Sequence, residues 1–354
     1  MKLLHVTEEA LAELCRKWVA QGLIATVQNE TNVALETVTA DASGPIVLRC
    51  ARAYTPVKSL LFPARERVAV YSTSGGSVEG ASPFEPEKRI VLGVRNCDLR
   101  AIALIDRIFL EGDYKDPLYE ARRRSLVLVS VDCVTDAESC FCDLVGLEPF
   151  PTEGFDLNLS PVEGGYVVEV GGEAGSALID SESGSFTEAS TAQLAERESN
   201  RKAIKAKLVA KNAEYKTARA INEVIGDVVD SERWQEEAKP CVECGACTNI
   251  CPTCHCFYLF DRLRSEPGSK AGQYDRVRTW DSCIFADYAR MAGGEAGKPN
   301  PRPQLRSRLE NRFTHKYLYI PQTYGVFGCT GCGRCSDACL GGIDPRKVIK
   351  NLEK

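Results

Sequence analysis

The stretch CVECGACTNICPTCHCF (Cys241–Phe257) contains two overlapping cysteine motifs that predict different cofactors. Its first part has the spacing C-x2-C-x2-C-x3-C-P, which is typical of cysteines that bind an iron–sulfur cluster. Its second part begins at Cys251 and reads C-x-x-C-H, the attachment motif of a c-type haem. Because Cys251 belongs to both motifs, the two interpretations exclude each other.

A second copy of the iron–sulfur spacing lies near the end of the chain, in CTGCGRCSDACL (Cys329–Leu340). One such motif can arise by chance, but two complete copies favour a pair of [4Fe–4S] clusters. In two-cluster proteins the first three cysteines of a motif bind one cluster and the fourth binds the other. The predicted ligands are Cys241, Cys244, Cys247 and Cys339 for cluster 1, and Cys329, Cys332, Cys335 and Cys251 for cluster 2.

Haem and zinc are the competing interpretations of these cysteines. Haem would take Cys251 away from its cluster, and no methionine or second histidine is placed as the other axial ligand. Zinc often uses histidine, whereas this chain has 17 cysteines and 3 histidines. All-cysteine zinc sites use the same thiols, but four in-phase cysteines in each motif fit a cluster better.

The composition predicts a globular protein of the reducing cytoplasm, where disulfides are disfavoured. The chain has 354 residues, enough for two or three domains. Its net charge of −5 argues against nucleic acid as the main partner. Apolar runs such as Ser125–Val131 are too short to span a bilayer, and the N-terminus lacks an apolar secretory core. We therefore expect a cytoplasmic location with no membrane span.

Apolar patterning predicts a mixed α/β chain made of three regions. Residues 1–186 resemble an α/β domain, with an amphipathic helix at Asp98–Leu110. Residues 187–238 are rich in Ala, Lys and Glu and contain no proline, which predicts a helical connector. The predicted strands of the first region are 46–48, 68–71, 90–94, 126–131 and 166–170.

Residues 239–354 contain both cysteine motifs, with a longer interval between them than a compact bacterial ferredoxin has. Helices are expected in this interval, at Asp281–Met291 and Leu305–Tyr319. The region resembles the α-helical ferredoxin module of fumarate reductase and heterodisulfide reductase subunits. Its basic stretch Arg302–Lys316 is interpreted either as a solvated helix or as a docking surface for an acidic partner.

Four further cysteines follow predicted strands of the first region. Cys97 and Cys133 lie just beyond the strands at 90–94 and 126–131, and the segment ESCFC follows the second of them. Because open α/β sheets bind ligands beyond the carboxyl ends of their strands, these thiols should converge. They suffice for a third [4Fe–4S] cluster, and the alternative is a set of partly buried free thiols. The expected ligands are Cys97, Cys133, Cys140 and Cys142; Cys254, Cys256 and Cys283 stay unassigned.

Several segments together resemble the 4Fe–4S dicluster family, which includes the β subunits of sulfhydrogenases and an iron–sulfur subunit of the anaerobic sulfite reductase. One of them departs from the usual family pattern, since Asn96 precedes Cys97 where proline is common. Outside these segments, Leu340 follows Cys339 where the ferredoxin motif usually has proline. The segments are Thr55–Val68, Gly93–Leu110, Asp132–Cys142, Cys251–Phe257, Arg278–Gly294 and Tyr324–Cys335.

The resemblance implies an iron–sulfur electron-transfer subunit of an anaerobic, multi-subunit oxidoreductase. Its expected partners are a flavoprotein subunit that reacts with NAD(P)H and a catalytic subunit of hydrogenase or sulfite reductase type. The alternative is a flavin- or thiol-dependent oxidoreductase that acts by itself, as the distantly similar F420-reducing β subunits do. The chain has no G-x-G-x-x-G motif and no Ser/His/Asp set, so we assign no catalytic residue and favour the relay.

Overall fold

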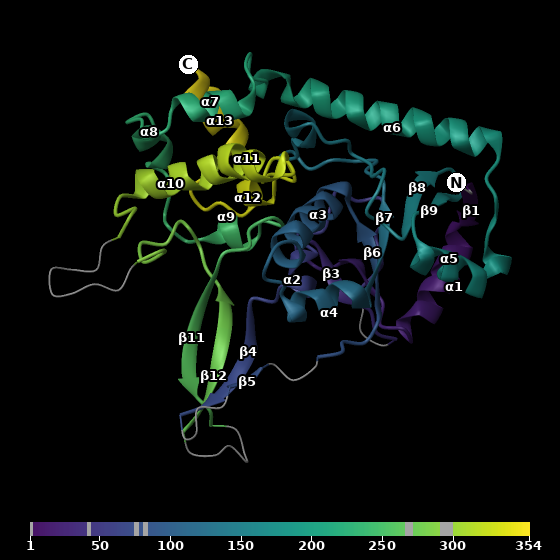
Figure 1. Ribbon diagram of the computed structural model, residues 1–354. Coiled ribbons are helices and arrows are strands. Elements are labelled where there is room, and N and C mark those ends of the chain that lie inside the picture. Colours follow the sequence, from purple (N-terminus) through teal and green to yellow (C-terminus); the bar gives the residue numbers. More distant parts are fainter. Residues whose placement is uncertain (1–2, 41–43, 74–77, 81–83, 266–271, 291–299) are drawn as a thin grey trace.

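The computed structural model describes the chain except for residues 1–2, 41–43, 74–77, 81–83, 266–271 and 291–299. Its described residues form a large and a small β-sheet, with most helices of the C-terminal region gathered apart from the large sheet (Figure 1). The large sheet has the order β10-β1-β9-β8-β7-β6-β2-β3. Its strands are β1 (Leu3–Thr7), β2 (Ile24–Gln28), β3 (Val33–Thr37), β6 (Arg89–Val94), β7 (Leu126–Val131), β8 (Leu157–Val162), β9 (Gly165–Val170) and β10 (Thr187–Glu188).

The centre of the large sheet is parallel, because β2, β6, β7 and β8 pair in the same direction. Strands β6 and β7 are almost entirely apolar and buried, as expected of parallel strands covered on both faces. The predicted strands at 90–94, 126–131 and 166–170 are confirmed as β6, β7 and β9. The helices around this sheet are α1 (Glu8–Val19), α2 (Lys58–Leu61), α3 (Asn96–Leu110), α4 (Pro117–Ser125) and α5 (Glu173–Ser181).

The predicted amphipathic helix is α3, and its apolar face packs on the large sheet. Its Leu99, Ile102, Ile105 and Phe109 are buried together with residues of β6 and β7. The predicted strand at 46–48 is wrong, since only Ile46 makes an isolated bridge to β2. Pro45 has no N–H to extend that pairing in one direction, and in the other direction Ile24 and Ala25 of β2 pair with β6.

The small sheet combines two strands of the first half with a hairpin from the cysteine-rich region. Its order is β11-β12-β4-β5, and it extends away from the helices as an arm (Figure 1). The predicted strand at 68–71 lies within β4, which pairs with β12 and not with the large sheet. The strands are β4 (Arg65–Ser72), β5 (Val78–Gly80), β11 (Phe257–Leu263) and β12 (Gln273–Trp280).

A long helix, α6 (Thr191–Asn212), runs from the large sheet to the C-terminal helices (Figure 1). It begins with a capping box, in which the Ser190 and Gln193 side chains bond to each other's backbone N–H groups. Two shorter helices, α7 (Ile221–Asp227) and α8 (Trp234–Ala238), lead to the first cysteine motif. Apolar residues of α7 and α8 are buried against the C-terminal helices, so this segment joins the second core.

The C-terminal region is mainly helical, and the predicted helix at 305–319 is confirmed as α10 followed by a π-helical turn. The predicted helix at 281–291 is wrong for residues 281–290, which form turns, while Met291 lies outside the described residues. There the Asp281 and Ser282 side chains accept bonds from backbone N–H groups and compete with a helix. The elements are α9 (Ala246–Asn249), α10 (Leu305–Thr314), the π-turn (His315–Tyr319), α11 (Ile320–Tyr324), α12 (Arg334–Asp337) and α13 (Pro345–Glu353).

Candidate metal centres

The four cysteines predicted for cluster 1 come together around one small cavity. Side chains of Ile284 and Leu309 close it on the apolar side, and the Arg312 guanidinium reaches it from α10. Cys244 is exposed, so one side of this cavity meets the surface. The cysteines that line it are Cys241, Cys244, Cys247 and Cys339.

Both cysteine motifs fold into the same local structure. In each, a glycine with positive φ (Gly245 at 70° and Gly333 at 71°) begins a four-residue helix, α9 or α12, that contains the third cysteine. Positive φ suits glycine, which has no Cβ to clash. Nearby backbone N–H groups point at sulfur: Gly331 N lies 3.4 Å from Cys329 Sγ and Ile343 N lies 3.3 Å from Cys339 Sγ. Such N–H groups would stabilise an anionic cluster.

The four cysteines predicted for cluster 2 are also neighbours, deeper in the protein. Burial, together with the nearby thiols of Cys251, Cys329 and Cys332, raises the pKa of Cys335 to about 12. Three of the four are almost fully buried, since Cys251, Cys332 and Cys335 are each less than 10% exposed. As cluster ligands these cysteines would be thiolates, and the iron of a cluster would share a negative charge that is costly to bury alone.

Buried cations balance this concentration of thiols. Lys316 donates to Cys251 Sγ at 3.3 Å and to Thr253 Oγ1 and Gly328 O at 2.9 Å. Among the described residues, no hydrogen-bond partner is found for Arg312 Nε. Burial works to lower the pKa of Arg312, but the thiols of Cys247 and Cys335 outweigh it and the pKa is raised. Arg312 thus lies between a predicted ligand of cluster 1 and one of cluster 2.

The basic stretch Arg302–Lys316 is not a wholly solvated helix, and its docking to an acidic partner stays a prediction. Arg308, Arg312 and Lys316 are only 3–5% exposed, and they recur every four residues. Arg308 donates to the Ile284 and Pro303 carbonyls, whereas the other two face the cysteines. Basic residues four positions apart, next to the apolar Leu309 and Phe313, are a sequence pattern that predicts a row of cations on the buried face of a helix. The high charge of the whole stretch made this pattern easy to miss.

The four tentative ligands of a third cluster line another cavity, at the carboxyl edge of the large sheet. Cys332 and Gly331 of the second motif lie at the same cavity. The structure thus brings together all three predicted sets of four cysteines: the third set is Cys97, Cys133, Cys140 and Cys142.

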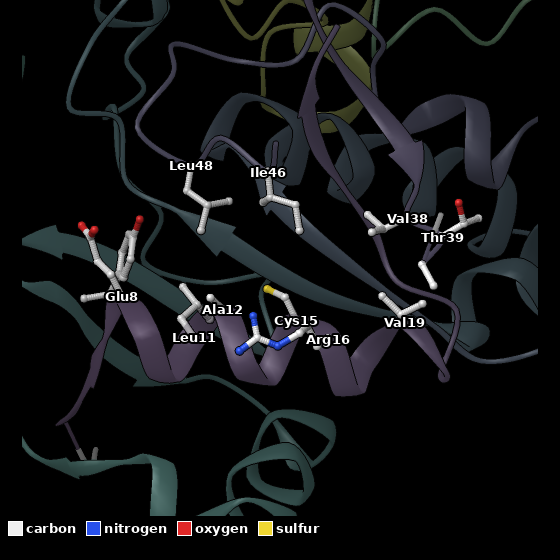
Figure 2. Close-up of a pocket in the computed structure, with 12 residues that line it drawn as sticks. Glu8, Leu11, Ala12, Cys15, Arg16, Val19, Val38, Thr39, Ile46 and Leu48 are labelled. Carbon is white, nitrogen blue, oxygen red and sulfur yellow. The ribbon is translucent and has the colours of Figure 1, made fainter. Parts of the chain in front are cut away.

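The three unassigned thiols lie around the first motif. Cys254 lies beside Cys251, and Cys256 Sγ is 3.3 Å from Tyr288 Oη. Cys283 is buried in the C-terminal core, and burial raises its pKa to about 12. Cys15 lies apart from these thiols, in an apolar groove between α1 and the segment that contains Ile46 (Figure 2).

Single-ion sites are a different matter from clusters. Within the part of the chain that the structure describes, no three His, Cys, Asp or Glu side chains are gathered closely enough to hold one metal ion.

Comparison with known proteins agrees with this geometry. Residues 240–343 match the 4Fe-4S dicluster domain. This part of the chain is therefore similar to a 4Fe–4S dicluster domain. The chain is also 29% identical over 300 residues, 84% of its length and 83% of the relative's, to sulfhydrogenase 2 subunit beta of Pyrococcus furiosus. The predicted resemblance to iron–sulfur electron-transfer subunits is thereby confirmed, and so is the mixed α/β fold with a C-terminal dicluster domain.

The iron–sulfur interpretation of Cys241–Phe257 is thus supported, and Cys251 lies in the matched domain. Among the described helices, none has the length and apolar character needed to cross a membrane.

Proposed function

We propose that this chain is the electron-relay subunit of a cytoplasmic, anaerobic oxidoreductase complex. Clusters 1 and 2 would pass single electrons between a flavoprotein subunit that reacts with NAD(P)H and a catalytic subunit of hydrogenase or sulfite reductase type. The observation that carries the proposal is the pair of self-similar cysteine loops. In each loop a glycine with positive φ precedes the short helix that contains the third cysteine, and Arg312 is buried between the two loops. We also propose that the chain divides into three regions, with boundaries after residues 186 and 238.

Each part of the site has a separate task in this relay. When bound, the clusters supply one-electron chemistry without forming or breaking covalent bonds to substrate. The cysteines hold the iron, and the N–H groups of Gly331 and Ile343 donate to ligand sulfur. Arg312 and Lys316 supply positive charge in a region from which water is excluded. Positive charge near a cluster favours its reduced, more anionic form, so these cations would raise its potential.

Cluster 1 is the better placed of the two to exchange electrons with a partner. Its ligand Cys244 is exposed, whereas three ligands of cluster 2 are buried. Two large apolar side chains flank the same cysteines at the surface: Val242 is 59% exposed and Leu340 is 80% exposed. Exposed apolar residues around a redox centre fit the protein surface of a partner subunit that brings its own flavin or cluster close.

The test is anaerobic preparation of the full chain, followed by iron and sulfide analysis and EPR. We expect a brown protein that contains no flavin, is reduced by dithionite, reoxidises with viologen dyes and does not react with NAD(P)H alone. A tightly bound flavin together with direct NAD(P)H oxidation would support the alternative, an oxidoreductase acting by itself. Colourless protein containing zinc would overturn the relay.

A further inference from the structure

We infer that Cys97, Cys133, Cys140 and Cys142 bind a third [4Fe–4S] cluster, and that cluster 2 is the middle member of a three-cluster chain. The inference deepens the proposed function, because its neighbours are clusters 1 and 2. The four thiols themselves lie outside the dicluster domain at 240–343, so they need an argument of their own.

The large sheet brings the four thiols together. Strands β6 and β7 are parallel neighbours, so both end at the same edge of the sheet. Cys97 lies in the first turn of α3, directly after β6, and Cys133 lies two residues after the end of β7. The loop that follows returns across this edge with Cys140 and Cys142, which completes the cavity.

The four thiols line one cavity, together with Asn96, Arg52 and the Gly331 and Cys332 residues of the second motif. Four cysteines around a single cavity match the four thiolates that a [4Fe–4S] cluster requires.

Two buried arginines give the cavity the charge that an anionic cluster requires. Arg95 is 1% exposed and donates to four backbone carbonyls, those of Val131, Asp132, Leu48 and Cys50. Arg52 is 9% exposed, lines the cavity and donates to Ser139 Oγ at 3.1 Å and to Asp337 Oδ2 at 2.5 Å. Arg95, which is held by carbonyls, keeps its charge available to a nearby anion, whereas Arg52 shares its charge with the Asp337 carboxylate.

This cavity is in direct backbone contact with the loop of cluster 2. Phe141 N donates to Gly331 O at 2.7 Å. A Cβ placed on Gly331 would lie 2.5 Å from the Cys142 backbone, and one placed on Gly333 would lie 2.2 Å from Ser139 O. The two loops therefore touch without room for a side chain between them, which is the kind of contact that short electron-transfer steps need.

The order of the three sites follows from which predicted ligands of one cluster line the cavity of another. Cys332, a predicted ligand of cluster 2, lines the third cavity, and Cys140 Sγ lies 3.8 Å from its carbonyl oxygen. Cys335, another predicted ligand of cluster 2, lines the cavity of cluster 1. Cluster 2 is therefore the central one. Each step transfers one electron from a reduced cluster to its oxidised neighbour, and no bond or proton moves.

The experiment compares iron and sulfide content in the anaerobically purified and reconstituted full chain. Wild type should contain about twelve irons, and the double variant Cys133→Ser/Cys142→Ser about eight, because one cubane is lost. Retention of the dicluster EPR signals in the variant shows that it has folded. The matched control is Cys50→Ser, since Cys50 lies near Cys133 and Arg95 but does not line the cavity.

About eight irons in wild type would overturn the third cluster and leave the relay intact, whereas no iron in any variant would overturn both. Loss of four irons in Cys50→Ser would overturn the ligand assignment. The order is tested by EPR of the fully reduced protein: spin coupling of cluster 2 should weaken when the third cluster is removed. Unchanged coupling would overturn the central position of cluster 2.

Discussion

Arg334 and Asp98 form a buried ion pair through two hydrogen bonds, of 3.0 and 2.8 Å, between α12 and the first turn of α3. Neither side chain is more than 3% exposed. Arg334 precedes Cys335 in the chain and Asp98 follows Cys97, so the pair joins a proposed ligand of cluster 2 to one of the third cluster. It fixes the dicluster domain onto the edge of the large sheet.

Removing Arg334 should be strongly destabilising. The variant Arg334→Met leaves the Asp98 carboxylate buried without its partner, which typically costs about 3–5 kcal/mol. We expect a lower denaturant midpoint, measured anaerobically on the loaded protein. The double variant Arg334→Met/Asp98→Leu should recover much of the loss, because no charge is left unpaired. Equal stability of wild type and Arg334→Met would show that the pair does not join the two regions.

Gly333 and Gly342 offer a matched pair for testing the contact between the loops. Both have positive φ, of 71° and 69°, so an alanine at either costs roughly 1–2 kcal/mol of backbone strain. Only at Gly333 would the new Cβ meet the backbone of Ser139, whereas nothing lies within 4 Å at Gly342. Gly333→Ala should therefore lose a further ~1–3 kcal/mol of stability. Equal loss in the two variants would mean that the loops can separate freely.

Charge at Arg312 should set the potentials of clusters 1 and 2. At about 6 Å and an effective dielectric constant of about 20, one charge is worth about 3 kcal/mol, or on the order of 100 mV for one electron. Arg312→Gln should therefore shift both potentials to more negative values in EPR-monitored titrations. Arg312→Lys keeps the charge and serves as the control. An unchanged potential in the Gln variant would show that Arg312 acts only in packing.

The exposed apolar pair beside cluster 1 should contribute to partner docking. Val242→Glu/Leu340→Glu adds two charges at the surface without replacing a proposed ligand, so iron content should stay unchanged. Electron transfer to the native partner subunit should fall by an order of magnitude or more, while dithionite still reduces the protein. A control at the exposed Tyr114, far from the cysteine loops in sequence, should leave both rates unaltered. Full activity of the double variant would place the docking surface elsewhere.

The cysteine sets and the order of the elements could be predicted from the sequence, because ligand spacing and apolar runs are local patterns. The strands β6, β7 and β9, the face of α3 and the helix at 305–319 were all predictable in this way. The turns at 281–290 were missed, because the capping side chains of Asp281 and Ser282 override a helical pattern of apolar residues.

What the sequence did not reveal depends on contacts between distant segments. The pairing of β4 with β12 and the ion pair of Arg334 with Asp98 join residues more than 200 positions apart. The sequence interpretation also missed the buried cations. Lys58, Arg95 and Arg334 are of residue types that usually lie at the surface, and their burial is evident only once the positions of the surrounding cysteines in the fold are known. Only the stripe of Arg308, Arg312 and Lys316 had a periodic pattern that could have indicated burial.

The pH dependence of stability should include a contribution from His315. Burial, with smaller contributions from Lys316, the His255 ring and Arg302, lowers its pKa to about 4. In the unfolded chain the pKa is about 6.5. Between these values the unfolded state binds a proton that the folded state does not, so stability is lost as pH falls from about 6.5 towards about 4.

The variant His315→Gln removes this titration but keeps a polar side chain at the same place on the π-turn. We expect wild type to lose on the order of 2–3 kcal/mol more than the variant between pH 7 and pH 4.5, measured by denaturant unfolding. Acid damage to the clusters affects both proteins alike, so the difference between them isolates the histidine. Parallel pH profiles would show that His315 is already accessible to protons in the folded protein.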